Sequence, residues 1–194
     1  TAGVQMANDP ITGVRNSSMH RMLLLDKNHM TCFAPKGRHL GTIIERNEDN
    51  GKGTEIATVI GGDPIIAIAS QCRPALGTDE MGMAGGLRGE AVKMVKCKTI
   101  DVEVPATAEI VIEGRTLPGL REDDGPFGEK PGTYSEERKA PVVEITAITM
   151  RKDAIFQNAY TGMPMTENHW MMDLAATALA YREAYKICPD IHDI

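Results

Sequence analysis

Short apolar runs, each bounded by glycine, proline, asparagine or aspartate, follow one another along most of the chain. Runs that are rich in β-branched residues and alternate with a period of two predict strands, because successive side chains of a strand point to opposite faces of a sheet. The expected strands are residues 3–7, 19–25, 29–33, 54–60, 92–97, 108–113, 142–150 and 155–159.

Turn and helix signals lie between these strands. Residues 26–28, Asp-Lys-Asn, separate the second run from the third and predict a hairpin between them. Residues 40–44 place their apolar side chains at helical spacing, which predicts a short helix with one buried face. The pair Asp63-Pro64 predicts a second helix that runs to Ala69, because aspartate caps a first helical turn and proline fits its first position.

Two further helices and one long loop complete the pattern. Thr78 is the expected cap of a helix over residues 79–87, and Thr166 is the expected cap of a C-terminal helix that stops before Pro189. Residues 118–137 contain many glycines, prolines and acids, which predicts a long loop that is functional or disordered. Together these elements predict an α+β, mainly β fold with short peripheral helices and a C-terminal helix.

The composition excludes several classes of protein. Of the 194 residues, 42% are hydrophobic and 25% are charged, which is typical of a globular domain. The net charge of -6 argues against a nucleic-acid coat or a membrane-surface binder, because both require positive fields. The longest nearly apolar run, residues 65–69, is too short to span a bilayer. Four cysteines without a CxxC pair predict reduced thiols and a cytoplasmic protein.

Two acids of the loop, Asp124 and Glu129, flank a rigid Gly-Pro step and a flexible glycine. Turn residues of this kind can present two side chains to one cavity, where one carboxyl group can hold a proton while the other stays ionised. A solvated acidic loop is the alternative interpretation. Phe127 favours the first one slightly, because a rare aromatic side chain within an acidic loop must pack somewhere.

Asn16, His39 and Glu80 offer one nitrogen and two oxygen ligands, a set that suits Mg²⁺ or Mn²⁺ rather than a soft metal. No close spacing ties these three residues together, so the set is a hypothesis. His20 and His29 are alternatives, although each lies in an alternating strand pattern and is expected at the surface or in the lining of a site. The two histidines near the C-terminus are expected to be solvated.

Residues 15–21 form a polar segment with two arginines that enters an apolar strand. A buried arginine needs a carboxylate partner, which Asp124 or Glu129 could supply; a surface loop with two ordinary arginines is the alternative. The glycine-rich residues 84–89 lack the Lys-Ser/Thr pair of a phosphate-binding loop, so a tightly packed helix end is expected there.

Several motifs occur in a fixed order along nearly the whole chain. They are residues 9–13 (DPITG), 16–21 (NSSMHR), 38–39 (RH), 80–89 (EMGMAGGLRG), 104–114 (VPATAEIVIEG), 124–129 (DGPFGE) and 160–164 (YTGMP). With these motifs the chain resembles the UbiD family of reversible decarboxylases, which use prenylated FMN. The resemblance implies that residues 1–194 form the family's central cofactor-binding region, a flavin-reductase-like split β-barrel, without the N-terminal α/β region and the C-terminal domain.

The resemblance also implies which residues bind the cofactor. Asn16, His39 and Glu80 match the residues that hold a divalent ion, Mn²⁺ or Mg²⁺, against the flavin phosphate, with K⁺ as a further ion. This matches the set of hard ligands obtained from residue types alone. The implied cofactor-binding residues are Asn16, Ser18, Met19, Arg21, Arg38, His39 and Glu80.

Three residues match the catalytic ones. Arg21 matches an arginine beside the flavin that pairs with the first loop acid, Asp124, and Glu129 matches the acid that protonates the substrate carbon. The mechanism implied is covalent capture of an aromatic or α,β-unsaturated carboxylic acid by the prenylated flavin, loss of carbon dioxide, protonation and release. The cofactor serves as the electron sink, and the protein orients the substrate and transfers the proton.

Partners and alternatives follow from the same resemblance. A flavin prenyltransferase would supply the cofactor, and the chain would act as a homo-oligomer or with a companion subunit. A second hypothesis is a flavin-binding domain or subunit that is inactive without the remaining domains. An ordinary flavin reductase is the least favoured, because nothing in residues 124–129 serves hydride transfer.

The chain departs from the family pattern in three places. Family members commonly carry Gly and Tyr within the segment that here reads Ser-Met-His at residues 18–20, so the shape or polarity of the pocket is expected to differ. Arg38 stands where glutamine is frequent and adds a positive charge. Asp124 is one methylene shorter than the usual Glu, which is expected to lengthen or shift its contact with Arg21.

Overall fold

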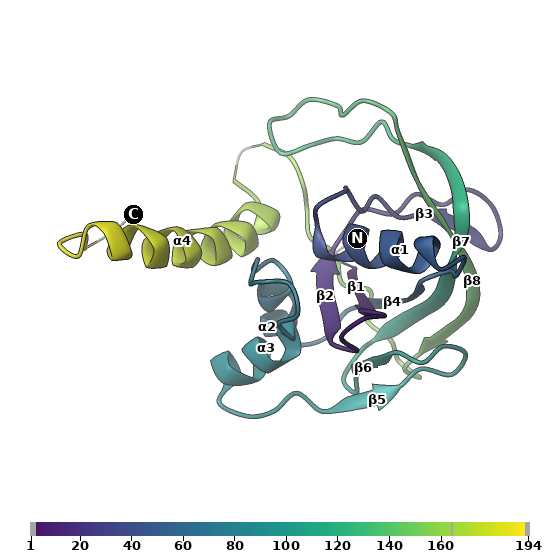
Figure 1. Ribbon diagram of the computed structural model, residues 1–194, viewed down its shortest axis with the longest axis horizontal. Helices are drawn as coiled ribbons and strands as arrows, with labels where there is room; N and C mark the ends of the chain where they lie inside the picture. Colours follow the sequence, from purple (N-terminus) through teal and green to yellow (C-terminus); the bar gives the residue numbers. More distant parts are fainter. Residues whose placement is uncertain (1–2, 164, 193–194) are drawn as a thin grey trace.

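One antiparallel sheet organises the chain, and helices lie against it and beside it (Figure 1). The computed structural model describes residues 3–163 and 165–192. Six strands pair in the order β2-β1-β4-β7-β8-β3, and β5 pairs with β6 in a separate ribbon. The elements are β1 (Val4–Asn8), β2 (Arg15–Met19), β3 (His29–Thr31), α1 (His39–Asp49), β4 (Glu55–Ile60), α2 (Pro64–Ala69), α3 (Glu80–Arg88), β5 (Met94–Lys96), β6 (Glu103–Pro105), β7 (Ile110–Asp124), β8 (Arg138–Met150) and α4 (Glu167–Ile187).

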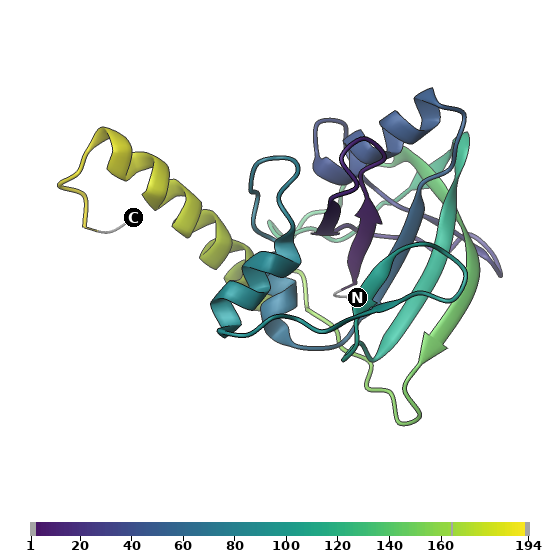
Figure 2. The same ribbon diagram turned by 60° about the horizontal axis from the view of Figure 1, so that its bottom comes forward.

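The predicted fold class is confirmed in its coarse form. The described chain is mainly β, with short helices around the sheet and one long helix at the C-terminal end (Figure 2). The sheet order begins at β2 and ends at β3, and within the described residues these two strands do not pair with each other. The sheet is therefore open along this seam, and closure into a barrel is not seen.

Both faces of the sheet are buried around β1 and β4. Met6 packs in one apolar cluster with residues of α2, α3 and β6, whereas the next residue, Ala7, packs in a second cluster with α1. This alternation follows from the period of two in a strand. The apolar face predicted for residues 40–44 is confirmed, because Leu40, Ile43 and Ile44 are buried in the second cluster.

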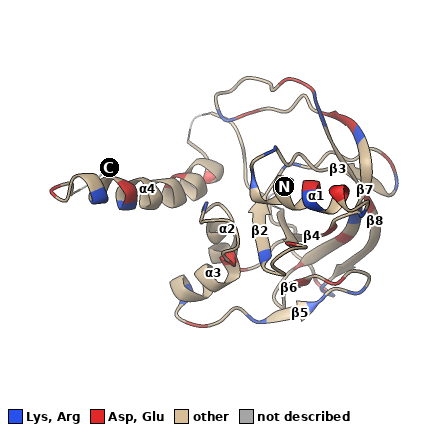
Figure 3. Ribbon diagram, viewed as in Figure 1, with Lys and Arg blue, Asp and Glu red and all other residues tan. Residues whose placement is uncertain are grey.

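The longest strands, β7 and β8, reach further than their apolar pattern indicates. Residues 118–137 were expected to form one loop, but the first seven belong to β7, whose last residue, Asp124, pairs with Arg138. The alternation is absent there because most residues of this part are exposed, and residues 121–124 are all charged, as the colours on β7 in Figure 3 indicate. Ion pairs such as Lys139–Asp123 at 2.9 Å replace apolar contacts. The extension of β7 is what delivers Asp124 to the interior.

Two other predicted strands need correction, and a further strand was not predicted. Residues 19–25 do not form one, since β2 ends at Met19 and only an isolated bridge joins Leu24 to Met30, so the expected hairpin is reduced to that bridge. The side chain of Gln5 accepts the backbone N–H of His20 at 2.6 Å and so replaces a strand partner at this point. Residues 155–159 carry no strand, and β6 was not expected.

The helix starts agree with the sequence except at α3. Asp63 caps α2 as predicted, because its carboxylate accepts the N–H of Ile65 at 3.0 Å. At α3 the cap is Asp79 rather than Thr78, so the helix begins at Glu80. Thr166 precedes α4 as predicted. The one-residue shift at α3 matters because it fixes where the side chain of Glu80 lies.

α4 projects from the rest of the chain and contacts it mainly at α2 (Figures 1 and 2). Ala175 is its only buried residue, and Trp170 and Leu174 are exposed. Among the described residues, none of the helices has the length and apolar character to cross a bilayer. Pro164, the last residue of the motif at 160–164, lies outside the described residues.

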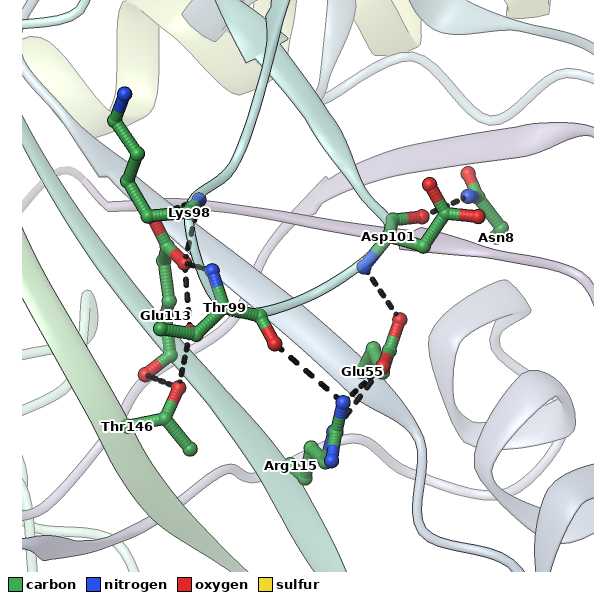
Figure 4. A network of polar contacts seen from close by, with 8 residues as sticks. All are labelled: Asn8, Glu55, Lys98, Thr99, Asp101, Glu113, Arg115 and Thr146. Carbon is green, nitrogen blue, oxygen red and sulfur yellow. Dashed lines mark hydrogen bonds and ion pairs between the residues drawn. The ribbon is translucent and has the colours of Figure 1, made fainter.

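A polar network fixes the segment at 98–101 against the sheet (Figure 4). Glu113 of β7 is 1% exposed, and its carboxylate accepts hydrogen bonds from the backbone N–H of Lys98 and from the N–H and hydroxyl of Thr99, at 2.7–3.0 Å. Burial alone would raise the pKa of Glu113, but these donors outweigh it and hold the pKa below its ordinary value. Beside it, Glu55 accepts from Arg115 at 2.7 Å.

We expect Glu113→Gln to lower the free energy of unfolding by about 1–3 kcal/mol at neutral pH, because the amide cannot accept all of these hydrogen bonds. The pKa of Glu113 is lower in the folded than in the unfolded chain, so the carboxylate stabilises the fold above the ordinary value of 4.5. This contribution disappears as the pH falls through the lowered pKa. Urea unfolding at neutral and acidic pH measures the difference.

Glu122→Gln is the matched control, since Glu122 lies exposed on the same strand. Its effect on the free energy of unfolding should stay within about 0.5 kcal/mol. Equal effects of the two substitutions would show that the buried network does not stabilise the fold.

Candidate active site

Segments that are far apart in the sequence converge beside β2. Asn16 lies on β2, His39 is the first residue of α1, and Glu80 is the first residue of α3. Asn16 Nδ2 lies 3.0 Å from Glu80 Oε1 and 3.4 Å from His39 Nδ1, and the last two atoms are 3.7 Å apart. The three residues proposed from residue type alone therefore form one cluster.

Two ion pairs hold the elements that carry this cluster. Arg15, next to Asn16 on β2, contacts Asp79 at 2.7 Å, and Asp79 is the cap of α3. Arg46 of α1 contacts the buried Asp9 at 2.7 Å, at the turn that joins β1 to β2. Both pairs tie a helix to the β1–β2 hairpin. They fix the first residue of α3 and the start of α1 relative to Asn16.

Burial sets the ionisation of the cluster. Glu80 is 1% exposed, and desolvation raises its pKa to about 7, although the N–H of Ser17 at 2.8 Å and the amide of Asn16 partly offset this effect. The pKa of His39 is lowered by desolvation and by the charge of Arg38. A neutral imidazole and a carboxylate that lacks a full counter-charge are groups that a divalent cation would bind.

The third member of this set is an amide. Among residues 3–163 and 165–192, three or more His, Cys, Asp or Glu side chains do not gather anywhere into a cluster that could hold a metal. One amide, one imidazole and one carboxylate thus make the densest ligand set beside β2. Such a set suits a hard cation that completes its coordination with other oxygen atoms.

Arg21 lies between the two loop acids. Its Nε is 2.6 Å from Asp124 Oδ2, and its Nη1 is 2.7 Å from Glu129 Oε1. The guanidinium stacks between two aromatic rings, 4.4 Å from the centroid of Phe33 and 4.8 Å from that of Phe127. The pairing of an arginine of residues 15–21 with these acids is seen, and 19% of the Arg21 side chain is exposed. The expectation of a solvated acidic loop fails for Asp124, which is buried, and holds in part for Glu129, whose side chain is 40% exposed.

One nitrogen of this guanidinium stays free. Nη2 of Arg21 is buried and has no hydrogen-bond partner among the described residues. Buried donors of charged groups are normally satisfied, because an unpaired one costs the desolvation free energy without compensation. The free donor therefore marks a position where an external acceptor could bind.

Asp124 is fully buried and is held from two sides. Thr31 donates its hydroxyl to Asp124 Oδ1 at 2.5 Å, while Arg21 contacts Oδ2. The expected lengthening of the Arg21 contact by the shorter side chain is not found. Because Asp124 ends β7 and pairs with Arg138, the backbone itself brings the carboxylate to the guanidinium.

Ser135 holds the loop that carries Glu129. Its hydroxyl oxygen accepts hydrogen bonds from Arg21 Nη1 at 3.1 Å and from the N–H of Phe127 at 3.0 Å. The sequence analysis missed Thr31, Phe33 and Ser135, and only the isolated aromatic residue in the loop pointed toward this packing. Serine and threonine are common in every context, so no local signal distinguishes these two.

The remaining predicted cofactor residues lie around the cluster. Ser18 bonds to Asn16 at 3.2 Å, and the sulfur of Met19 accepts from Gln71 at 2.9 Å. Arg38 is exposed at the start of α1, where it adds the expected positive charge. His20 is partly buried, with its ring between Ser18 and the carbonyl of Phe33, which agrees with the expected position in the lining of a site.

His29, the other alternative ligand, lies apart from the cluster. Its ring pairs with Asp26 at 3.0 Å, in the turn before β3. Of the two C-terminal histidines, His192 is exposed, as expected. His169 is partly buried, because its Nδ1 accepts the backbone N–H of Thr166 at 3.1 Å and so helps to start α4.

The family model for the 3-octaprenyl-4-hydroxybenzoate carboxy-lyase Rift-related domain, UbiD, matches residues 1–164. The chain belongs to the UbiD family. It is 35% identical over its whole length to the anhydromevalonate phosphate decarboxylase of Methanothermobacter thermautotrophicus, and it covers 45% of that protein. The chain therefore spans less than half the length of this UbiD relative.

Solved UbiD-class structures match the whole chain as well. HmfF from Pelotomaculum thermopropionicum, in complex with prFMN, is 39% identical with a TM-score of 0.92, and 44% of it is covered. Vanillic acid decarboxylase from Sedimentibacter hydroxybenzoicus, in its closed form, is 29% identical with a TM-score of 0.93, and 42% of it is covered.

A more distant likeness concerns the fold alone. Flavoredoxin of Desulfovibrio vulgaris is 10% identical, with a TM-score of 0.54 over 80% of this chain and 74% of its own. The UbiD chain thus shares its backbone arrangement with a protein outside the decarboxylases named above.

We expect Thr31→Val to lower the free energy of unfolding by about 1–3 kcal/mol, because Asp124 Oδ1 then stays buried without its donor and the N–H of Leu23 loses its acceptor. Valine has nearly the same shape as threonine, so the packing changes little. Thr149→Val on β8 is the control, since the hydroxyl of Thr149 makes no hydrogen bond within the described residues and its loss should cost less than about 0.5 kcal/mol. Chemical denaturation of both variants checks this, and equal stabilities would contradict it.

Proposed function

We propose that this UbiD chain is the part of a decarboxylase that binds prenylated FMN and a divalent metal. Its reaction would be the reversible, non-oxidative removal of carbon dioxide from an aromatic or α,β-unsaturated carboxylic acid. The observation that carries the proposal is Arg21, held between Asp124 and Glu129 with one buried nitrogen still free. The named relatives with whole-chain likeness, an anhydromevalonate phosphate and a vanillic acid decarboxylase, support the reaction class.

Prenylated FMN fits the polar groups around Arg21. The free Nη2 of Arg21 offers a donor to a flavin or to a substrate carboxylate, and the HmfF structure with prFMN supports a flavin at such a site. Ser18, Met19 and Arg38 are the further contacts proposed for the cofactor. We also propose that the open sheet corresponds to a split β-barrel of the flavin-reductase type, which the likeness to flavoredoxin supports.

A divalent ion fits the neighbouring cluster. Asn16, His39 and Glu80 would hold Mn²⁺ or Mg²⁺ through an amide oxygen, an imidazole nitrogen and a carboxylate. The raised pKa of Glu80 supports this assignment, because a cation would restore the charged carboxylate. K⁺ is proposed as a further ion of the site.

The prenylated flavin, when bound, supplies the electron sink for the carbon that loses carbon dioxide. Arg21 would bind and orient the negatively charged group of the substrate through Nη2, and Asp124 keeps the guanidinium in place through Nε. Glu129, whose side chain is 40% exposed, is the more accessible of the two acids and in its protonated form would give its proton to the substrate carbon. In the carboxylation direction the same carboxylate would accept that proton.

The whole activity requires more than this chain would supply. Because the chain covers 45% of its decarboxylase relative, we propose that it works with further domains, as a homo-oligomer or with a companion subunit, and that a flavin prenyltransferase supplies its cofactor. A cytoplasmic location is proposed for the assembled enzyme. The same coverage supports a second candidate, a flavin-binding module that is inactive without the remaining domains.

We expect Glu129→Gln, in the complete enzyme loaded with prenylated FMN and Mn²⁺, to reduce carbon dioxide release by at least about 100-fold while flavin binding is kept. The amide still accepts from Arg21 but cannot transfer a proton. Carbon dioxide release from a panel of unsaturated acids and hydrogen–deuterium exchange at the reacting carbon measure the loss, and the flavin absorbance measures binding.

Glu136→Gln is the control, because Glu136 is an exposed acid of the same loop. Unchanged turnover of Glu129→Gln would remove the role given to this residue. A complete protein that binds the flavin but releases no carbon dioxide from any substrate of the panel would contradict the decarboxylase proposal. Carbon dioxide release by the complete protein, with flavin binding but no release by residues 1–194 alone, would favour the binding module. A colourless, folded protein would contradict both candidates.

A further inference from the structure

Three polar side chains at alternate positions form a line beside the metal cluster. Asn16 and Ser18 lie on one face of β2, and His20 continues that face just beyond the strand, since side chains repeat with a period of two. Ser18 Oγ lies 3.2 Å from Asn16 Oδ1 and 3.0 Å from His20 Nε2. His20 Nδ1 in turn lies 2.9 Å from the carbonyl oxygen of Phe33.

The contact between His20 and the carbonyl of Phe33 determines which atoms of this line carry hydrogens. A carbonyl oxygen can only accept a hydrogen bond, so Nδ1 of His20 must carry the hydrogen that faces Phe33. Burial of the ring lowers the pKa of His20 to about 4, so the imidazole is neutral at physiological pH. A neutral imidazole has a single N–H. Nε2 is therefore an acceptor, and Ser18 is the donor within reach.

Ser18 has one hydroxyl hydrogen and two neighbours that can accept it. If that hydrogen points to Asn16 Oδ1, the lone pair of His20 Nε2 has no donor, which is unfavourable for a buried group. If it points to His20, Ser18 presents only lone pairs to Asn16. The amide of Asn16 must then turn by half a revolution, so that Nδ2 donates to Ser18.

This half-turn changes what the amide presents to the metal cluster. With Nδ2 toward Ser18, the amide oxygen takes the place 3.0 Å from Glu80 Oε1 and 3.4 Å from His39 Nδ1. When Glu80 is ionised and His39 carries its hydrogen on Nε2, three hydrogen-bond acceptors then face one another, and they repel unless a cation lies between them. Without a cation, the opposite orientation is stabilised by the hydrogen bond from Nδ2 to Glu80.

We propose that His20 is a positioning residue that, through the hydroxyl of Ser18, turns the amide oxygen of Asn16 toward Glu80 and His39 for a divalent cation. His20 does not touch the cation. By accepting the hydroxyl hydrogen of Ser18, His20 disfavours the orientation in which Asn16 Nδ2 points toward Glu80 and His39. It therefore favours the orientation of Asn16 that binds metal. The inference rests on the metal set of the proposed function, but the hydrogen-bonded line itself does not depend on it.

The tautomer of His20 directly tests the proposed hydrogen bonds among His20, Ser18 and Asn16. Nitrogen-15 NMR of the uniformly labelled, metal-free protein at neutral pH should show a protonated Nδ1 and an unprotonated Nε2 for His20. A protonated Nε2 would overturn the inference, because Ser18 could then donate to Asn16 and the amide would have no reason to turn. This measurement needs neither metal, flavin nor activity.

Mn²⁺ binding tests the consequence. Titration with Mn²⁺ alone, with the free ion measured by EPR, should give about a five-fold weaker affinity for His20→Phe than for the unchanged protein, since one neutral hydrogen bond no longer favours the binding orientation. His29→Phe, which removes a histidine outside the cluster, is the control and should bind as the unchanged protein does. Circular dichroism confirms that each variant is folded.

Ser18→Ala keeps the inference testable if His20→Phe does not fold. It should weaken Mn²⁺ binding by a similar factor, and His20→Phe should then add little in the Ser18→Ala background, because both act through one hydroxyl. Independent, additive effects would overturn the inference, as would unchanged affinity in both variants. If the unchanged protein binds Mn²⁺ no better than the Glu80→Gln variant does, the proposed metal ligands are wrong. The hydrogen bonds among His20, Ser18 and Asn16 are then tested by the NMR result alone.

Discussion

The buried ion pair between Arg21 and Asp124 is the constraint on which the rest of the site depends. Burying two charges costs several kcal/mol per ion unless each is paired and its remaining hydrogen-bonding groups are satisfied. The chain meets this condition with a threonine behind the aspartate, a serine beside the guanidinium and two aromatic rings against it. Among the described residues, the buried side-chain atoms without a hydrogen-bond partner are Nη2 of Arg21 and Oγ of Ser17, and we propose that Nη2 binds a ligand.

The cluster of Asn16, His39 and Glu80 is paired less completely. Glu80 is buried, yet it has only an amide, a backbone N–H and the edge of His39 around it, and its pKa rises accordingly. An anion that is underpaired in the free protein is a natural ligand for a cation. The two carboxylates thus differ in their pairing: Asp124 is paired by Arg21 and Thr31, whereas Glu80 lacks a full counter-charge.

Periodicity and residue type predict the core elements and the chemically distinctive site residues, but not the residues that hold the site residues in place. The apolar period located the core strands and the buried face of α1, because packing decides those positions directly. It failed for the outer part of β7, where pairing with β8 holds a charged and exposed segment in a strand. The proposed ligands and Arg21 have distinctive chemistry and could be proposed from the sequence. Thr31 and Ser135 have common side chains whose roles arise only from tertiary contacts.

The separation of the site residues along the chain has a consequence for folding. Arg21 and Asp124 are 103 positions apart, and Asn16 and Glu80 are 64 apart. Contacts of such long range form only after the intervening chain has been ordered, and they slow folding. A protein of this kind cannot bind its ligands while it is partly folded, so ligand binding would report on completion of the whole sheet. Any ligand that binds only the native state would in turn stabilise strands far from the site by mass action.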